Sequence, residues 1–89
     1  MKVSEIYYTS KFARRFKKLP KNIQGIAVEK EASFRQDCFT PALRTHKLHG
    51  PFGETWAFSL TRSYRIIFRF ETKDTVTFID VGTHTIYRA

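Results

Sequence analysis

The C-terminal part of the sequence constrains the fold most, because three segments with β-strand character follow one another with only short turns between them. Residues 55–60, 64–70 and 75–81 are rich in aromatic and β-branched side chains, the residue types enriched in strands. In the middle segment Arg65 and Arg69 alternate with apolar residues, as in a strand with one covered face. Strict alternation along the third segment places on one face Val76, Phe78 and Asp80. Short turns join antiparallel neighbours, so the sequence predicts a three-stranded antiparallel meander.

The N-terminal part shows helical periodicity after a short β-prone start. Residues 3–8 predict a strand, and Thr9 or Ser10 can then N-cap a helix. The apolar stripe of this helix, with a period of 3.6 residues, consists of Phe12, Phe16 and Leu19. Pro20 ends this helix and begins a second one that extends to about Gln36. The predicted fold is therefore α+β: an N-terminal strand, an antiparallel two-helix hairpin and the meander, with the helices packed on one face of an antiparallel sheet.

Length and composition indicate one folded domain over residues 1–89. The hydrophobic content is 42% and the aromatic content 16%, which excludes a disordered chain. Cys38 is the only cysteine, so an internal disulfide framework or a cysteine-based zinc cluster is excluded. No apolar run approaches the ~20 residues of a membrane span, and the N-terminus lacks the apolar stretch of a signal peptide. We therefore expect a cytoplasmic protein with no membrane partner.

The charge of the chain points to a polyanionic partner. Sixteen Lys and Arg residues against eight Asp and Glu give a net charge of +8, which favours nucleic acid first and an acidic protein segment second. Six cations with no intervening acid occur between residues 11 and 21, namely Lys11, Arg14, Arg15, Lys17, Lys18 and Lys21. This patch can neutralise phosphates or be the solvated face of the first helix. The excess of one sign favours phosphate contact.

A second group of polar residues lies on or beside the predicted strands. Its members are His46, Lys47, His49, Arg62, Arg65, Arg69 and His84, with Tyr87 near the C-terminus. Arginine holds phosphate through bidentate hydrogen bonds, and histidine transfers protons near neutral pH. RNA cleavage without a metal requires a base for the 2′-OH, a cation for the charge on the phosphorane and an acid for the leaving 5′-oxygen. The spacing alone leaves open the alternative that these histidines are structural and these arginines face solvent.

Metal binding and cysteine chemistry are not expected. The three histidines lack the HxxxH and HExxH spacings, and Asp80 is the only carboxylate near His84 in the sequence. Cys38 has no activating pattern around it and is interpreted as an inert thiol. Trp56 is interpreted as a core or sheet anchor.

Three segments of the chain resemble the RelE/ParE superfamily of bacterial toxins from type II toxin–antitoxin systems. The first is the helix 8–19, with the sequence YTSKFARRFKKL. The second runs from KLHG at residues 47–50 through Trp56 to SYRIIF at residues 63–68, and the third is FIDVGTH at residues 78–84. Their order and spacing span nearly the whole chain. The His49 loop and the Gly-Thr-His ending are most similar to the RelE/YafQ-like branch, whose members cut mRNA on the ribosome.

The resemblance implies roles for individual residues. Arg65 corresponds to the arginine that stabilises the transition-state phosphate, and His84 to the histidine that protonates the leaving 5′-oxygen. His49 corresponds to a loop histidine with a base or positioning role, and Tyr87 to an aromatic residue that supports the substrate. The basic residues expected to contact nucleic acid are Lys11, Arg14, Arg15, Lys17, Lys18, Lys21, Lys47 and Arg62. No metal or other cofactor is implied.

The resemblance predicts a ribosome-dependent endoribonuclease toxin (an mRNA interferase) that inhibits translation, with ribosomal RNA, mRNA and a cognate antitoxin as partners. A toxin–antitoxin hetero-oligomer is also expected. Two alternatives stay open: a ParE-like inhibitor of DNA gyrase, and a non-catalytic module that binds only its antitoxin. Trp56 and Phe58 stand where classical RelE strands carry paired lysines, and Asp80 stands where close nuclease relatives tend to carry an arginine, which is why the second alternative is kept.

Overall fold

A computed structural model describes residues 1–49 and 53–88 of the chain. The sequence Gly-Pro-Phe-Gly at residues 50–53 predicts a loop or turn, and residues 50–52 of it lie outside the described residues. In chain order the elements are β1 (Glu5–Tyr8), α1 (Ser10–Lys17), α2 (Lys21–Gln36), the 3-10 turn η1 (Pro41–Leu43), β2 (His46–Lys47), β3 (Thr55–Ser59), β4 (Tyr64–Phe70), β5 (Thr75–Thr83) and the 3-10 turn η3 (His84–Arg88).

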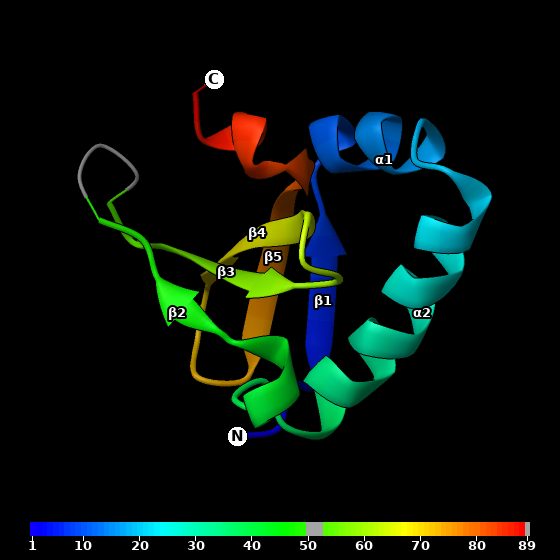
Figure 1. Cartoon of the computed structure of the whole chain (residues 1–89). Helices are drawn as coiled ribbons and strands as arrows, with labels where there is room; N and C mark the ends of the chain where they lie inside the picture. The colour runs from blue at the N-terminus through cyan, green and yellow to red at the C-terminus, as the bar shows by residue number, and fades with distance from the viewer. Residues whose placement is uncertain (50–52, 89) are drawn as a thin grey trace.

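The strands form one mixed sheet with the order β1-β5-β4-β3-β2 (Figure 1). The β3–β4–β5 meander is confirmed, because each of its neighbouring pairs is antiparallel. The sheet differs from the prediction at its two edges, in a parallel pair at one and an additional antiparallel strand at the other. At one edge β1 pairs in parallel with β5, because the two helices carry the chain across before the meander begins. At the other edge β2 pairs with β3. Because β2 has only two residues, it is too short to show the alternation of apolar and polar residues by which a strand is predicted from sequence.

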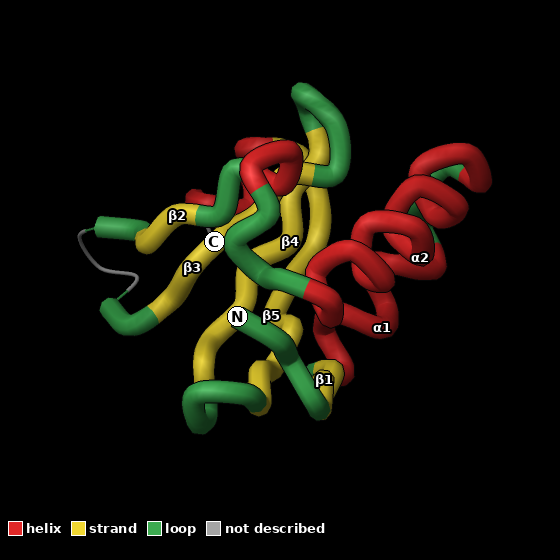
Figure 2. Tube along the Cα trace, turned by 90° about the horizontal axis from the view of Figure 1, so that it is seen from below, coloured by secondary structure: helices red, strands yellow, loops and turns green. Residues whose placement is uncertain are grey.

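Both helices lie on one side of the sheet, as predicted (Figure 2). Thr9 is the N-cap of α1: its hydroxyl oxygen accepts a hydrogen bond from the Phe12 backbone N–H at 3.0 Å. The same hydroxyl donates to the Ile79 carbonyl at 2.8 Å, which fixes the start of α1 against β5. Pro20 precedes α2, where its missing N–H costs no hydrogen bond. Neither helix has the length and apolar character needed to cross a membrane within the described chain.

The core between the helices and the sheet is an aromatic cluster centred on Phe34 of α2. The Phe34 ring lies 4.6 Å from that of Phe58, 4.9 Å from that of Phe68 and 5.5 Å from that of Phe78. All four side chains are 0% exposed. Ring pairs at these separations add to the stability gained from burying their area. One face of the meander is thus fixed against α2.

A β-bulge in β5 overturns the predicted facing of Asp80. The register of β4 and β5 shifts between Ile67 and Phe68, so that Ile67 pairs with Asp80 while Phe68 pairs with Phe78. The extra residue, Ile79, reverses the alternation beyond it. Val81 consequently joins the core cluster with Phe78, and Asp80 is on the other face with Ile67.

The face of the sheet away from the helices is covered at one end by the C-terminal turn. Gly82 pairs with Arg65 across β4 and β5. A Cβ atom added to Gly82 would come within 2.6 Å of Ile86 Cγ2, so η3 packs against the backbone of β5 where only glycine leaves room. The rest of this face, called the open face below, carries the polar residues of the meander.

Candidate functional site

A groove of about 530 Å³ lies on the open face beside the turn between β3 and β4. Arg65 of β4 and Ser59 of β3 form its floor as a cross-strand pair. Three further side chains that carry a positive charge or can take up a proton border the groove: Arg44 and His46 from the segment around β2, and Arg62 from the turn between β3 and β4. The lining residues of this arginine groove are Ala42, Arg44, His46, Ser59, Leu60, Thr61, Arg62 and Arg65. Three guanidinium groups around one groove form an anion-binding environment.

Arg44 and His46 are held at the groove by an unusual backbone. Arg44 has φ 52° and ψ 41°, in the left-handed region, which residues other than glycine, asparagine and aspartate rarely adopt. Its N–H donates to the Pro41 carbonyl at 3.1 Å. Its carbonyl oxygen lies 2.9 Å from His46 Nδ1. Because a carbonyl only accepts, this contact places the proton on Nδ1 and leaves Nε2 of the neutral ring as a proton acceptor.

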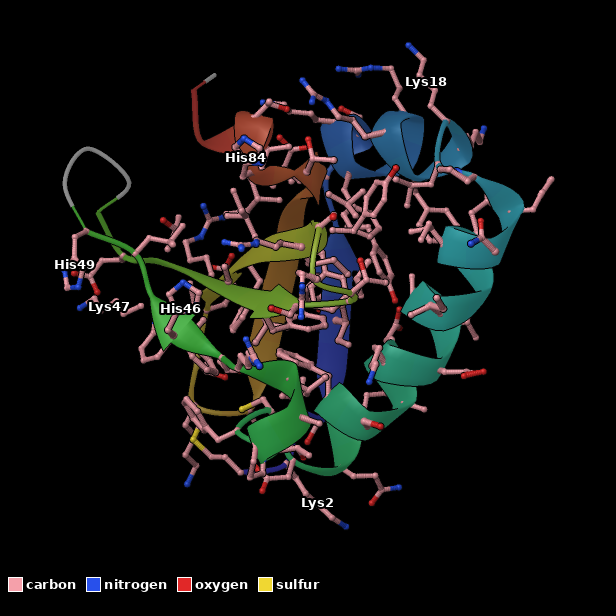
Figure 3. The ribbon with its side chains drawn as sticks, viewed as in Figure 1. Lys2, Lys18, His46, Lys47, His49 and His84 are labelled. Carbon is pink, nitrogen blue, oxygen red and sulfur yellow. The ribbon has the colours of Figure 1, made fainter. Side chains whose placement is uncertain are left out.

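The structure brings together some of the predicted site residues and separates others. Arg65 and Arg62 share the arginine groove. His49 is exposed and does not line that groove. Figure 3 shows His49 and Lys47 further out along the β2–β3 hairpin, away from His84. Lys47 pairs with Trp56 on the opposite face from the groove, and its ammonium group lies 3.6 Å from a Glu54 carboxylate oxygen.

His84 follows directly on β5 and is exposed. It lies two residues beyond Gly82, which pairs with Arg65, so it belongs to the same end of the sheet as the groove. Figure 3 shows it above His46 in that view. The backbone of Tyr87 lies in η3, but its side chain is outside the described part of the structure. The predicted role of Tyr87 therefore stays a prediction.

Sequence reasoning missed Arg44 and His46 as a pair at the site and assigned the loop histidine to His49 instead. The choice depends on which residues pair with β3: His46 pairs with Ala57, on the face that also carries Ile67 and Arg65. No sequence signal marks this pairing, because β2 is only two residues long. The left-handed Arg44 gives no signal either, since glycine or asparagine usually marks such a position.

The cation-rich helix α1 is not free of acids in space, contrary to its appearance in the sequence. Asp80 of β5 is 3% exposed, and its carboxylate lies 3.4 Å from Lys11 Nζ and 3.5 Å from Arg15 Nε. β1 pairs with β5 only as far as Phe78, so α1 occupies the edge of β5 beyond it. Two of the six predicted phosphate-binding cations are thereby paired with a buried carboxylate.

An apolar groove of about 380 Å³ separates the two helices. Phe12 and Phe16 of α1 form one side, and Val28 of α2, which is 65% exposed, forms the other. Tyr8 stands at its border, where its hydroxyl donates to Glu31 at 2.6 Å. Partial burial and the bond to the Glu31 carboxylate both raise the pKa of Tyr8. We call this feature the helix groove.

Residues 1–49 and 53–86 contain no group of three His, Cys, Asp or Glu side chains close enough to share an ion. Burial raises the pKa of the Cys38 thiol, which keeps it protonated and weakly nucleophilic at neutral pH.

No protein-family model and no curated protein matches the sequence, but solved structures match its fold closely. A YoeB/ParE toxin from Agrobacterium tumefaciens superposes with a TM-score of 0.75 at 12% identity, covering 91% of this chain and 99% of that one. A chain of the E. coli DinJ-YafQ toxin–antitoxin complex gives a TM-score of 0.76 at 14% identity, covering 100% of both. The chain has the RelE/ParE toxin fold. A chain of the RelBE2 toxin–antitoxin complex from Mycobacterium tuberculosis is similar as well, with a TM-score of 0.73, 22% identity and coverage of 90% and 96%.

The match to the RelE/ParE toxin fold includes the parts that position the arginine groove. The alignment with the DinJ-YafQ chain covers the whole of both chains, so both helices and all five strands lie within it. At these identities the likeness fixes the backbone arrangement and leaves the side chains to be judged one by one.

Proposed function

We propose that this chain is the toxin of a type II toxin–antitoxin system and that it cleaves translated mRNA on the ribosome. The observation that carries the proposal is the convergence of Arg44, His46, Arg62 and Arg65 on one groove of the open face. Three arginines supply the charge that a phosphodiester requires, and the histidine supplies a proton acceptor. The RelE/ParE toxin fold supports the same conclusion by analogy.

In the proposed reaction His46 Nε2 takes the proton of a ribose 2′-OH. The 2′-oxygen then forms a bond to the adjacent phosphorus while the bond from phosphorus to the 5′-oxygen breaks. Arg65 stabilises the charge that builds up on the phosphoryl oxygens, and protonated His84 donates a proton to the leaving 5′-oxygen. The products are a 2′,3′-cyclic phosphate and a free 5′-hydroxyl. Base, cation and acid all come from the chain, so the scheme includes no metal ion.

The groove is shallow and open on one side, which accords with a substrate delivered by a larger particle. A chain of 89 residues cannot enclose a strand of RNA. Orientation of the 2′-oxygen in line with the leaving group is therefore assigned to the ribosome, which holds mRNA in its decoding site. Positioning of this kind can supply several kcal/mol of the barrier reduction.

An antitoxin is the expected protein partner, and the helix groove offers it a docking site. The Agrobacterium neighbour is itself a toxin, and the DinJ-YafQ and RelBE2 neighbours were solved as toxin–antitoxin complexes. The apolar walls of this groove, the half-buried Phe16 and the exposed Val28, fit the apolar side of a helix, and the net charge of +8 favours an acidic one. A disordered antitoxin segment that folds as it binds would meet both requirements.

The test compares two arginines of the same strand and face. Wild type, Arg65→Ala, His84→Ala and the control Arg69→Ala are added to translating ribosomes, and the ends of the mRNA are mapped. We expect codon-phased cuts from wild type and Arg69→Ala, and a loss of about 10²- to 10³-fold in single-turnover rate for Arg65→Ala. His84→Ala is expected to lower the rate by about 10²-fold. Circular dichroism and thermal melts check that each variant is folded.

Two results would overturn the proposal. Equal cleavage rates for Arg65→Ala and Arg69→Ala would show that the arginine groove does not take part in cleavage. Intact mRNA in cells that accumulate gyrase–DNA breaks would instead identify a ParE-like gyrase inhibitor.

A further inference from the structure

The buried carboxylate of Asp80 divides the cations of α1 into two sets. Lys11 and Arg15 lie 3.4 Å and 3.5 Å from its two oxygens. The Val81 N–H also donates to Asp80 Oδ1, at 2.8 Å. A carboxylate that is 3% exposed requires such partners, because an uncompensated buried charge is strongly unfavourable. Lys11 and Arg15 therefore serve the attachment of α1 to β5.

Two of the remaining cations, Arg14 and Lys18, border a second hollow at the end of α1, of about 490 Å³. We call it the α1 hollow. It is lined by Arg14, Arg15, Lys18, Leu19, Pro20, Tyr64 and Val81. Arg14 and Lys18 are exposed and lie one helical turn apart, so both face the same way. Figure 3 shows Lys18 projecting outward from this end of the molecule.

The α1 hollow and the arginine groove lie back to back across β4. Tyr64 lines the first and Arg65 lines the second. Consecutive residues of a strand point to opposite faces about 3.8 Å apart along the chain, so only the end of one strand separates the two features. Figure 3 places Lys18 and His84 at the same end of the molecule. A single extended chain passing over this end meets both features in turn.

We propose that the α1 hollow is a second binding site for an RNA backbone, occupied by phosphates that flank the segment held in the arginine groove. Arg14 and Lys18 neutralise these phosphates, and the ring of Tyr64 offers a face for a base. The identification of the ligand as RNA rests on the proposed function. The separation of Lys11, which is paired with Asp80, from Arg14 and Lys18, which are exposed, does not depend on the proposed function.

The chemistry of the lining favours RNA over an acidic protein segment. Two exposed cations, Arg14 and Lys18, border the hollow, as successive phosphates require, and Tyr64 is a half-buried aromatic residue. Cationic side chains beside an aromatic platform are the usual means of binding single strands without sequence preference. An acidic helix would be bound better by the helix groove, whose lining is mainly apolar and includes the exposed Val28.

The experiment measures the binding of a fluorescent single-stranded RNA as a function of salt. The RNA carries 2′-O-methyl groups throughout, which prevents attack by the 2′-oxygen, and binding is followed by anisotropy between about 50 and 200 mM KCl. Arg14→Gln/Lys18→Gln is compared with Lys2→Gln/Lys73→Gln, which removes the same charge. Both control lysines are exposed, and Lys2 lies at the opposite end of the molecule (Figure 3).

We expect the α1 double variant to bind about tenfold more weakly at the lowest salt. Its plot of log affinity against log salt should be shallower by about 0.7 for each phosphate that the variant no longer neutralises. Tyr64→Leu should weaken binding about fivefold or more with no change in that slope, while Tyr64→Phe should bind like wild type. Lys11→Gln should lower the melting temperature and leave the slope unchanged.

Three results would overturn the inference. The α1 double variant could bind RNA as its control does, Lys11→Gln could reduce the slope as much as the α1 double variant does, or a poly-glutamate peptide could compete with the RNA only in proteins that retain Arg14 and Lys18. None of these results bears on Arg65-dependent cleavage. Conversely, loss of cleavage dependence on Arg65 with a normal salt response would overturn the proposed function and leave this site in place.

Discussion

The two faces of β4 differ in what their side chains do. Ile66 and Phe68 point to the helices, are 1% and 0% exposed and belong to the aromatic core. Arg65 and Arg69 point to the open face, where one lines the arginine groove and the other is held by a carboxylate. Because strand residues alternate between faces, a single seven-residue strand carries stability on one side and the proposed chemistry on the other. The two properties should therefore be separable by mutation.

The largest effect on stability is expected from Phe34→Ala. Its ring contacts the rings of three strand phenylalanines, and truncation of a buried Phe costs about 3–5 kcal/mol. That is a large part of the ~5–15 kcal/mol by which domains are stable. Urea unfolding measures the loss. Val28→Ala, on the same helix but 65% exposed, is the control and should stay within about 0.5 kcal/mol of wild type; equal losses would show that the core is not centred on α2.

On the open face, the sharpest contrast is between His46→Ala and His49→Ala. Removal of a general base typically costs about 10²-fold or more in rate, so His46→Ala should lose that factor in ribosome-dependent cleavage. His49→Ala should cleave at close to the wild-type rate. Neither change should alter thermal stability greatly, since both side chains are exposed. A reversed ranking would return the base role to His49, as the sequence resemblance implied.

Gly82→Ala tests how η3 is held to the open face. The new Cβ would lie 2.6 Å from Ile86 Cγ2, and overpacking of this kind costs about 1–3 kcal/mol. Cleavage should also fall, because η3 begins with His84. In the double variant Gly82→Ala/Ile86→Ala the clash is absent, so its loss of unfolding free energy should be smaller than the sum of the two single losses. Additive losses would show that the two residues do not meet.

Most of the fold could be predicted from the sequence, because its signals are local. The alternation in 64–70 predicts the bounds of β4 without error, and Thr9 marks the start of α1 through its capping oxygen. The facing of Asp80 could not be predicted, since the bulge at Ile79 depends on the register between two strands. Its pairing with Lys11 and Arg15 is likewise a consequence of where β1 stops beside β5.

The candidate site was only half predictable for a similar reason. Arg65 and Arg62 come from a strand and a turn that the sequence locates well. His46 and Arg44 come from a segment whose geometry is set by a two-residue strand and a left-handed backbone, neither of which has a composition signal. Long-range pairing decides which histidine faces the groove.

Arg44→Gly separates stability from binding at a single residue. Removal of the side chain relieves the strain of the left-handed backbone, which raises the free energy of unfolding by about 1–2 kcal/mol. Glycine also has more conformational freedom in the unfolded chain, which lowers the free energy of unfolding by about 0.5–1 kcal/mol. The variant should therefore unfold at equal or higher urea concentration, with a net gain of between zero and about 1.5 kcal/mol in the free energy of unfolding. It should bind single-stranded RNA more weakly, because the groove loses one guanidinium group. A destabilised variant with unchanged RNA affinity would mean that Arg44 serves the fold.

The smallest expected effect is on the pH dependence of stability, and it involves Arg69 but not Arg65. Glu71 accepts hydrogen bonds from Thr77 Oγ1 at 2.6 Å and from Arg69 Nε and Nη2 at 3.0 and 2.9 Å. These bonds, the one from Thr77 foremost, hold the pKa of Glu71 below its ordinary value of 4.5. The Glu71 carboxyl group thus binds its proton less tightly in the folded chain than in the unfolded chain. The stabilisation is complete above pH 4.5 and is lost as the pH falls through the lowered pKa.

Glu71→Gln should therefore reduce the fall in melting temperature between about pH 5.5 and pH 3. Thr77→Val removes only the leading hydrogen bond and should give an intermediate profile. Arg65→Ala should leave the acid profile of the wild type unchanged, because Arg65 pairs with Gly82 at the other end of the strand. If Arg65→Ala flattened the profile as Glu71→Gln does, the two ends of the open face would be electrostatically coupled, and Arg69 would no longer be a clean control for Arg65 in the cleavage assay.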